Sequence, residues 1–269
     1  MVIKSLKLKN YRNYELLDMT FDSKTNILYG DNAQGKTNIL EALYLSGTTK
    51  SHRGTKDRDL IQFGREESHL ETIVEKKGME FQIDMHLKKN SPKGIAINKI
   101  PIRKASELFG IVHFVFFSPE DLNIIKAGPA GRRRFIDLEL SQIDKVYLSN
   151  LSNYNRIINQ RNSLLKELYH QDHLMDTLDI WDEKLSALGG VIIRMRMEYT
   201  RWLQKEAEDI YKGISMERES FSLDYRPFEL PVQEGQTQRE ISSLLLEKMM
   251  QNRSEDLRSG STGIGPHRD

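Results

Sequence analysis

The sequence predicts an α/β protein in which a strand-rich first part is followed by a mainly helical second part. Three patterns in the 269 residues support this prediction. Apolar and polar residues alternate in several short segments before residue 118, as they do in half-buried strands. A glycine-rich motif at residues 30–37 lies between a short apolar segment and an amphipathic run. Between residues 147 and 202, apolar residues recur at spacings of three and four, which is typical of helices.

The first part of the chain is expected to hold one helix among several strands. The helix begins at Lys36, where good helix formers carry an apolar face. Lys77 and Gly78 suit a hairpin turn, and Pro101 belongs at an edge or at the end of a strand. The expected strands cover residues 2–8, 26–29, 70–75, 80–87, 94–102 and 111–117.

The second part is expected to be built around two helices, at residues 147–168 and 178–202. The connection between them is short, which favours an antiparallel pair packed within the chain. An intermolecular coiled coil is the alternative use of the same apolar stripe. A strand at 221–225 and a helix at 236–252 follow, and the boundary between the two parts is expected near residues 118–135.

Composition restricts the class of protein. The chain has no cysteine, which excludes disulfides, a thiolate metal site and a cysteine nucleophile. Its start is too charged for a secretory signal, and no segment approaches the roughly 20 apolar residues of a membrane helix. We therefore expect a cytoplasmic protein that does not enter a membrane. The net charge of +1 gives no indication for or against a nucleic acid partner.

The motif at residues 30–37 predicts a site for a nucleoside triphosphate. It matches the pattern G-x-x-x-x-G-K-[ST], and the expected strand and helix flank it as the mechanism requires. Glycines allow backbone N–H groups to point inward at phosphates, Lys36 supplies a charge for the β- and γ-phosphates, and the Thr37 hydroxyl can bind Mg²⁺. A glycine turn that happens to contain lysine and threonine is the alternative.

Hydrolysis would also need a carboxylate at the end of another strand. Glu120 and Asp121 are the best candidates, but Ser118 and Pro119 separate them from the expected strand at 111–117. We therefore favour a loop that lines the nucleotide site over a segment that positions water.

Five sequence blocks together resemble the RecF family, the bacterial recombination mediator ATPases related to the heads of SMC and Rad50 proteins. The blocks lie at residues 8–13, 30–37, 51–53 with 57–61, 117–122 with 128–129 and 132–137, and 265–269. The resemblance implies a P-loop ABC-type ATPase head lobe with a mixed sheet and a helical lobe II that bears an antiparallel helix pair. It divides the chain into nucleotide-binding lobe I at 1–122, lobe II at 123–255, and a return toward the ATPase core at 256–269.

The resemblance implies ATP and Mg²⁺ as cofactors. Lys36 would stabilise phosphate charge, Thr37 would bind Mg²⁺, and residues 118–122 would form the loop that senses the γ-phosphate. A solvated turn after the first strand is the alternative for residues 10–13. The implied nucleotide-binding residues are Arg12, Asn13, Gly30, Asp31, Asn32, Ala33, Gln34, Gly35, Lys36, Thr37 and Asn38.

Two basic clusters are candidates for contact with DNA. The residues concerned are Arg53, Lys56, Arg132, Arg133 and Arg134. Solvated surface or intramolecular ion pairs are the alternative, and no motif that reads bases is visible. The histidines, including His170 and His173, do not suggest a metal site.

The resemblance implies ATP-dependent recognition of double-stranded or gapped DNA, help in loading the recombinase for gap repair, a RecR-like clamp partner and an ATP-dependent homodimer of the full-length protein. In the family, a signature motif and an Asp-rich strand follow the last block, whereas this chain stops at Asp269. We therefore expect an N-terminal fragment that binds ATP with little or no hydrolysis. A small-molecule P-loop kinase and a partner-docking arm with a vestigial P-loop are the alternatives.

Overall fold

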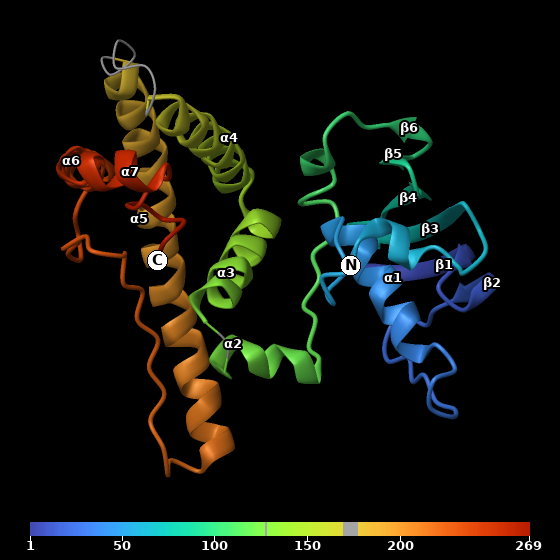
Figure 1. Cartoon of the computed structure of the whole chain (residues 1–269). Helices are drawn as coiled ribbons and strands as arrows, with labels where there is room; N and C mark the ends of the chain where they lie inside the picture. Colours follow the sequence, from blue (N-terminus) through green and yellow to red (C-terminus); the bar gives the residue numbers. More distant parts are fainter. Residues whose placement is uncertain (127, 169–176) are drawn as a thin grey trace. The chain divides into compact units, whose positions relative to one another are not determined.

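The computed structural model describes residues 1–126, 128–168 and 177–269, and it divides into two compact units (Figure 1). Unit 1 covers Met1–Pro119 and unit 2 covers Glu120–Asp269. Within the described residues, no helix is both long enough and apolar enough to cross a membrane. His170 and His173, which were not expected to form a metal site, lie outside the described residues.

Unit 1 is built on a six-stranded sheet with the order β2-β1-β3-β4-β5-β6, in which every neighbouring pair is antiparallel. The strands are β1 (Val2–Tyr11), β2 (Tyr14–Thr20), β3 (Glu67–Lys76), β4 (Met79–Lys88), β5 (Ser91–Ile97) and β6 (Ile100–Pro101). The expected hairpin joins β3 to β4 through Lys77 and Gly78, both with positive φ, as the tight hairpin turn requires.

The core of unit 1 lies between one face of the sheet and helix α1 (Lys36–Thr48). Alternate residues of β1, β3 and β4 are buried there, as the period of two predicts. Helix α1 contributes Ile39, Ala42 and Leu45 to the same cluster. Short 3-10 turns at Asp57–Leu60 and Ala105–Glu107 complete the unit.

Two strand predictions in unit 1 were wrong. The structure forms no strand at residues 26–29, and the expected strand at 111–117 is reduced to an isolated bridge at Val112. Ile27, Tyr29, Val115 and Phe117 are at least 79% exposed. Apolar and β-branched residues favour a strand, but a strand exists only when its backbone pairs with a neighbour. Neither segment joins an edge of the described sheet, and this sheet is antiparallel where a mixed sheet was expected. Strand β2 was not predicted.

Unit 2 is mainly helical, as predicted. Its helices are α2 (Asn123–Lys126), α3 (Pro129–Ile143), α4 (Lys145–Leu168), α5 (Leu178–Ser215), α6 (Gln238–Gln251) and α7 (Arg253–Ser259), after a 3-10 turn at Pro119–Leu122. Residues early in α4 contact residues late in α5 and vice versa: Tyr147 bonds to Arg196, whereas Arg161 bonds to Asp182. Helices α4 and α5 are therefore the antiparallel pair that the apolar stripes predicted.

Three details of unit 2 differ from the prediction. Residues 221–225 form no strand, and helices α3 and α7 were not anticipated. Residue 202, the last position of the predicted apolar stripe, is Trp202 and is 55% exposed. Helix α5 continues for a further 13 residues to Ser215, beyond the part that packs in the buried cluster. Arg161, the residue that interrupts the apolar stripe of α4, is completely buried.

Arg161 is the centre of a buried ionic network. Its guanidinium donates to Asp182 at 2.7 Å and to Asp256 at 2.7 Å, so one cation links α4 to α5 and α7. A third bond reaches the Thr262 hydroxyl at 2.8 Å. The charged residue that interrupts the apolar stripe therefore makes a tertiary contact that joins three helices.

Replacing Arg161 with alanine is expected to lower the free energy of unfolding by about 3–5 kcal/mol, because buried Asp256 loses the arginine that pairs with it and buried Asp182 keeps only Arg253. Urea unfolding followed by circular dichroism measures the change. Arg194→Ala is the control: Arg194 is 48% exposed and pairs with Glu198 one turn away, so we expect a loss below about 0.5 kcal/mol. Equal losses of unfolding free energy in the two variants would contradict the role of Arg161 as the centre of a buried ionic network.

Candidate nucleotide-binding site

The motif at residues 30–37 leads into α1, and most of its residues are exposed. Gly30, Ala33 and Gly35 all have positive φ, at 141°, 64° and 101°. Such left-handed positions turn successive backbone N–H groups toward one side, where an anion can accept from them. The first turn of α1 carries no acidic side chain, so the positive end of the helix is not neutralised.

Lys36 lies across this loop. Its ammonium group donates to the main-chain oxygen of Gly30 at 2.7 Å and to that of Asp31 at 2.6 Å. The side chain therefore curls back over the loop that the motif assigns to phosphates, and the carbonyl oxygens are acceptors that a phosphate can replace. Thr37 follows in the first turn of α1, with an exposed side chain.

The turn between β1 and β2 packs on the loop. The Asn13 amide donates to the Gln34 main-chain oxygen at 3.1 Å and accepts from the Asn38 amide at 2.8 Å. A Cβ at Gly35 would lie only 2.7 Å from the Asn13 side chain and 2.8 Å from the Tyr14 hydroxyl. Position 35 therefore needs glycine both for its φ and for space. The turn packs on the loop, and its contact with a nucleotide stays a prediction.

Arg12 is held in a buried ion pair with Glu41 on α1. Its guanidinium donates to the two carboxylate oxygens at 2.9 Å and 2.8 Å, and to the Asp59 main-chain oxygen at 3.0 Å. Burial acts to raise the pKa of Glu41, but hydrogen bonds from Arg12 and Ser51 outweigh it and hold this pKa below its ordinary value. The structure thus places Arg12 as a support for α1.

Glu41 was missed by the sequence analysis. It is completely buried, and Ser51 donates a third hydrogen bond to it at 2.5 Å. Its position among the apolar residues of α1 was the signal that could have found it. Acidic residues are rarely buried without a partner, so a buried glutamate there predicts a nearby cation.

A cavity of about 910 Å³ opens beside this turn. It brings together three predicted nucleotide residues, Arg12, Asn13 and Asn38, with Arg53, predicted for DNA, whose guanidinium lies 3.4 Å from the Asn38 side-chain oxygen. Lys56 is exposed and does not line it. The remaining lining residues are Arg58, Asp59, Ile61, Gln62, Phe63, Gly64 and Lys89. The lining holds four cations and one carboxylate, but Arg12 and Lys89 also pair with Glu41 and Glu66, which do not line it.

The other predicted site residues lie in or next to unit 2. Arg132, Arg133 and Arg134 occupy the first turns of α3, where Arg132 donates to the Ile124 main-chain oxygen at 3.3 Å and Arg133 donates to that of Asp269. Arg134 is exposed. Intramolecular contacts therefore account for part of this cluster, and contact with DNA stays a prediction, as does the γ-phosphate role of residues 118–122.

A magnesium ion would depend on the phosphates for most of its ligands. Among residues 1–126, 128–168 and 177–269, no three histidine or carboxylate side chains gather in a way that could hold a metal ion. Mg²⁺ commonly keeps waters and binds phosphate oxygens with one or two protein ligands. The Thr37 hydroxyl fits that role, which stays a prediction.

Comparison with known proteins identifies the family. The profile described as AAA ATPase domain matches residues 1–256. The DNA replication and repair protein RecF of Agathobacter rectalis is 56% identical over 270 residues, which cover 100% of this chain and 71% of that protein. The chain belongs to the RecF family. RecF of Lachnospira eligens is 51% identical over 271 residues, covering 100% of this chain and 72% of that protein.

A solved RecF structure shares the fold. The structure described as the recombination mediator protein RecF-ATP in the RecFOR pathway has a TM-score of 0.92 and 34% sequence identity, and the match covers 99% of this chain and 72% of that one. Membership of the RecF family confirms the predicted fold class, an ABC-type head with a helical lobe. The chain is a RecF-like ATPase of DNA repair that binds ATP.

The last RecF-type block, at residues 265–269, is built into unit 2. Buried Arg196 of α5 donates to the Pro266 main-chain oxygen at 2.7 Å and to the Asp269 carboxylate at 2.9 Å. His267 lies between the Tyr154 hydroxyl, 2.9 Å from Nδ1, and the Thr262 main-chain oxygen, 3.0 Å from Nε2. Since a carbonyl only accepts, Nε2 carries the proton and Tyr154 donates to Nδ1, which satisfies the neutral ring.

His267 makes the stability of this RecF-like chain depend on pH. Burial lowers the pKa of His267 from 6.5 to about 4, and it outweighs the hydrogen bond to the Thr262 carbonyl. Between these values the unfolded chain binds the proton and the folded chain does not. This part of the stability is therefore present above pH 6.5 and is lost as pH falls toward 4.

Between pH 7 and pH 5, we expect the unfolding free energy of the wild-type chain to fall by about 2 kcal/mol more than that of His267→Gln, since glutamine does not titrate. Urea unfolding of both proteins at each pH measures the difference. The comparison with the variant is needed because buried Asp269 has a raised pKa, which makes the unfolding free energy rise as pH falls. This contribution is present in both proteins and cancels in the difference. Parallel curves would contradict a neutral, buried His267.

Proposed function

We propose that this chain binds MgATP at residues 30–38 and serves in ATP-dependent recognition of gapped duplex DNA, with help in loading the recombinase for gap repair. The observation that carries the proposal is the loop itself. Left-handed backbone at Gly30, Ala33 and Gly35, an uncapped start of α1 and the Lys36 ammonium together present donors to one anion. The names of the relatives, DNA replication and repair protein RecF, supply the biological setting.

In this proposal the residues divide the work of binding. Lys36 exchanges the Gly30 and Asp31 carbonyls for phosphate oxygens, which are stronger acceptors because they are charged. Thr37 offers its hydroxyl to Mg²⁺. Asn13 keeps the loop in register through Gln34 and Asn38, and Arg12 contributes positive charge at the cavity while Glu41 fixes its position.

Binding rather than rapid turnover is expected. None of residues 30–37 lines the cavity beside the turn, and among the described residues that do, Asp59 is the one carboxylate, with the Arg58 guanidinium 3.6 Å from it. A general base for water needs a free carboxylate within reach of the reacting phosphate. ATP would then act as a switch that changes which surfaces can meet DNA or a partner.

The DNA and partner assignments are part of the same proposal. Arg132, Arg133 and Arg134 on α3, with Arg53 and Lys56 in unit 1, are the candidates for phosphate contacts. A RecR-like clamp and an ATP-dependent homodimer of the full-length protein are the proposed partners, in the cytoplasm. A solved relative is described as a recombination mediator of the RecFOR pathway, which supports these assignments.

A titration with fluorescent ATP and Mg²⁺, with hydrolysis followed in the same samples, tests the nucleotide site. Lys36→Ala is expected to weaken ATP about 100-fold, because charge-assisted bonds to phosphate are lost. Lys24→Ala removes an equal charge from an exposed position near the loop and is expected to stay within about twofold. Unchanged affinity in Lys36→Ala would refute the site, and absence of binding in the wild-type chain would favour a vestigial loop.

The same proteins are then mixed with a gapped duplex and with a blunt duplex of equal length. We expect tighter binding to the gapped duplex, an ATP-dependent gain in the wild-type chain and in Lys24→Ala, and no such gain in Lys36→Ala. Equal affinity for both duplexes, at matched salt, would contradict gap recognition while leaving ATP binding intact.

A further inference from the structure

Exposed apolar side chains of unit 2 surround the carboxylate of Glu139 on α3. Phe135 and Ile143 lie one turn before and one turn after Glu139, so the three side chains share one face of the helix. Phe135 is 37% exposed and Ile143 is 61% exposed, whereas Glu139 is half-buried between them. Single exposed apolar residues are common on protein surfaces, but a contiguous group of them marks a candidate binding surface.

Helix α5 adds two aromatic rings to the same surface. Tyr199 lines a cavity of about 370 Å³ together with Phe135, and the nearby charge of Glu139 adds to burial in raising the pKa of Tyr199. The Tyr199 ring lies 5.8 Å from the ring of Trp202, which is 55% exposed. We call these five residues, Phe135, Glu139, Ile143, Tyr199 and Trp202, the α3–α5 patch.

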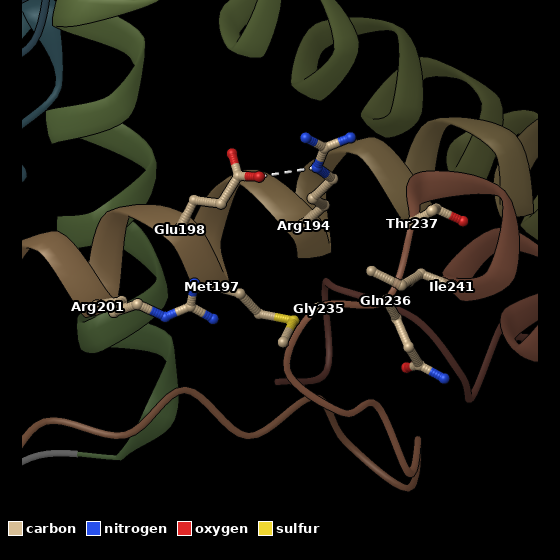
Figure 2. A pocket seen from close by; sticks show the side chains of 8 residues that line it. All are labelled: Arg194, Met197, Glu198, Arg201, Gly235, Gln236, Thr237 and Ile241. Carbon is tan, nitrogen blue, oxygen red and sulfur yellow. Dashed lines mark hydrogen bonds and ion pairs between the residues drawn. The ribbon is translucent and has the colours of Figure 1, made fainter.

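Glu139 differs from the other carboxylates around the patch. Asp137 pairs with Arg196 at 2.7 Å, and Glu198, one turn before Trp202, pairs with Arg194 at 2.8 Å (Figure 2). Within the described residues, the Glu139 carboxylate has neither a hydrogen bond nor an ion pair. Burial raises the pKa of Glu139, and no neighbouring cation opposes this effect. The charged form is therefore disfavoured in the folded chain, and a cation brought by a partner would relieve that cost.

The arginines that line the 370 Å³ cavity do not neutralise Glu139, because each of them bonds to another group of unit 2. Arg132 donates to the Ile124 main-chain oxygen, Arg133 to that of Asp269, Arg196 to Asp137 and Asp269, and Arg226 to Asp224. The patch thus presents a negative charge that no cation of the described residues occupies.

We propose that the α3–α5 patch is a docking site for an arginine side chain of a partner protein. The guanidinium would pair with the Glu139 carboxylate through two parallel hydrogen bonds and lie against the exposed ring of Trp202. The apolar neighbours of that arginine would cover Phe135 and Ile143, as in the apolar centre of a protein interface.

The chemistry of the patch favours arginine over other cations. A metal ion needs more ligands than one carboxylate, and the described residues gather no group of three histidine or carboxylate side chains that could hold one. The ammonium group of lysine is a strongly hydrated point charge, whereas the planar guanidinium of arginine is more weakly hydrated, stacks on aromatic faces and matches the two oxygens of a carboxylate. Arginine is also among the residues that dominate interface energies.

Glu183 offers a matched control for the loss of one negative charge. It is exposed on α5, roughly 24 Å along the helix from Tyr199, so it lies outside the patch. Replacing either glutamate with glutamine keeps the size of the side chain and removes the charge.

Fluorescence anisotropy tests the proposal. The probe is a fluorescein-labelled peptide in which one arginine is flanked by leucines. Two control peptides replace the arginine, one by citrulline, which keeps the shape without the charge, and the other by lysine. The proteins are the whole chain and its Glu139→Gln, Trp202→Ala and Glu183→Gln variants, and circular dichroism shows that each variant is folded.

We expect the wild-type chain to prefer the arginine peptide over the citrulline peptide by about tenfold and over the lysine peptide by about threefold. Glu139→Gln is expected to weaken the arginine peptide by about tenfold and to leave the citrulline peptide unchanged, because the two groups act on each other. Trp202→Ala is expected to weaken the arginine peptide by about threefold, and Glu183→Gln to stay within about twofold.

Urea unfolding at pH 7 separates this role of Glu139 from a structural one. Because burial disfavours the charge of Glu139, Glu139→Gln is expected to unfold at the same urea concentration as the wild-type chain or at a higher one. A clearly lower midpoint would show that Glu139 supports the fold and would contradict the proposal.

Three binding results would overturn the proposal. They are absence of binding to the arginine peptide, equal affinity for the citrulline peptide, and equal weakening by Glu183→Gln. Self-association of the wild-type chain in sedimentation that Glu139→Gln abolishes would also overturn it, because the patch would then be occupied by a second copy of this chain.

Discussion

The turn between β1 and β2 presses on the glycine-rich loop, and the form of the nucleotide site follows from this contact. Asn13 bonds to Gln34 on the loop and to Asn38 on α1, so strand, loop and helix are joined through one side chain. Gly35 has no space for a Cβ under that turn and has a φ that favours glycine. A loop held in this way presents its donors before a phosphate arrives, which reduces the ordering cost of binding.

Buried arginines connect the elements on which both units depend. In unit 1, Arg12 ties the turn after β1 to Glu41 on α1. In unit 2, Arg161 joins α4 to α5 and α7, and Arg196 joins α5 to the segment that ends at Asp269. A buried ion pair adds little net stability, but loss of one partner is costly, so such pairs tolerate few alternative arrangements. The residues around the nucleotide loop and the last RecF-type block are positioned by this kind of contact.

Features with local causes could be predicted from the sequence. The helix after Lys36, the hairpin turn at Lys77 and Gly78, and the helix pair each depend on residues close together in the chain. The phosphate loop has a local pattern of the same kind. The family followed from the order of several such blocks, which makes their combination specific.

Features that depend on distant partners could not be predicted. The burial of Glu41 and of Arg161 is explained only by the oppositely charged groups that pair with them, which lie far away in the sequence. The strands predicted at 26–29 and 111–117 failed for a related reason: their composition favours strands, but neither segment pairs with a strand of the described sheet. Arg53 illustrates the limit for sites: its charge indicated DNA, and the structure places it beside Asn38 on the cavity next to the turn between β1 and β2.

Hydrogen–deuterium exchange of the whole chain with and without MgATP tests most directly the claim that turn, loop and helix form one preorganised phosphate site. The account predicts slower exchange on addition of MgATP for backbone amides at 31–38 together with the turn at 12–14, and little change in β4 and β5. Protection confined to other segments, or none in the loop at saturating MgATP, would contradict it.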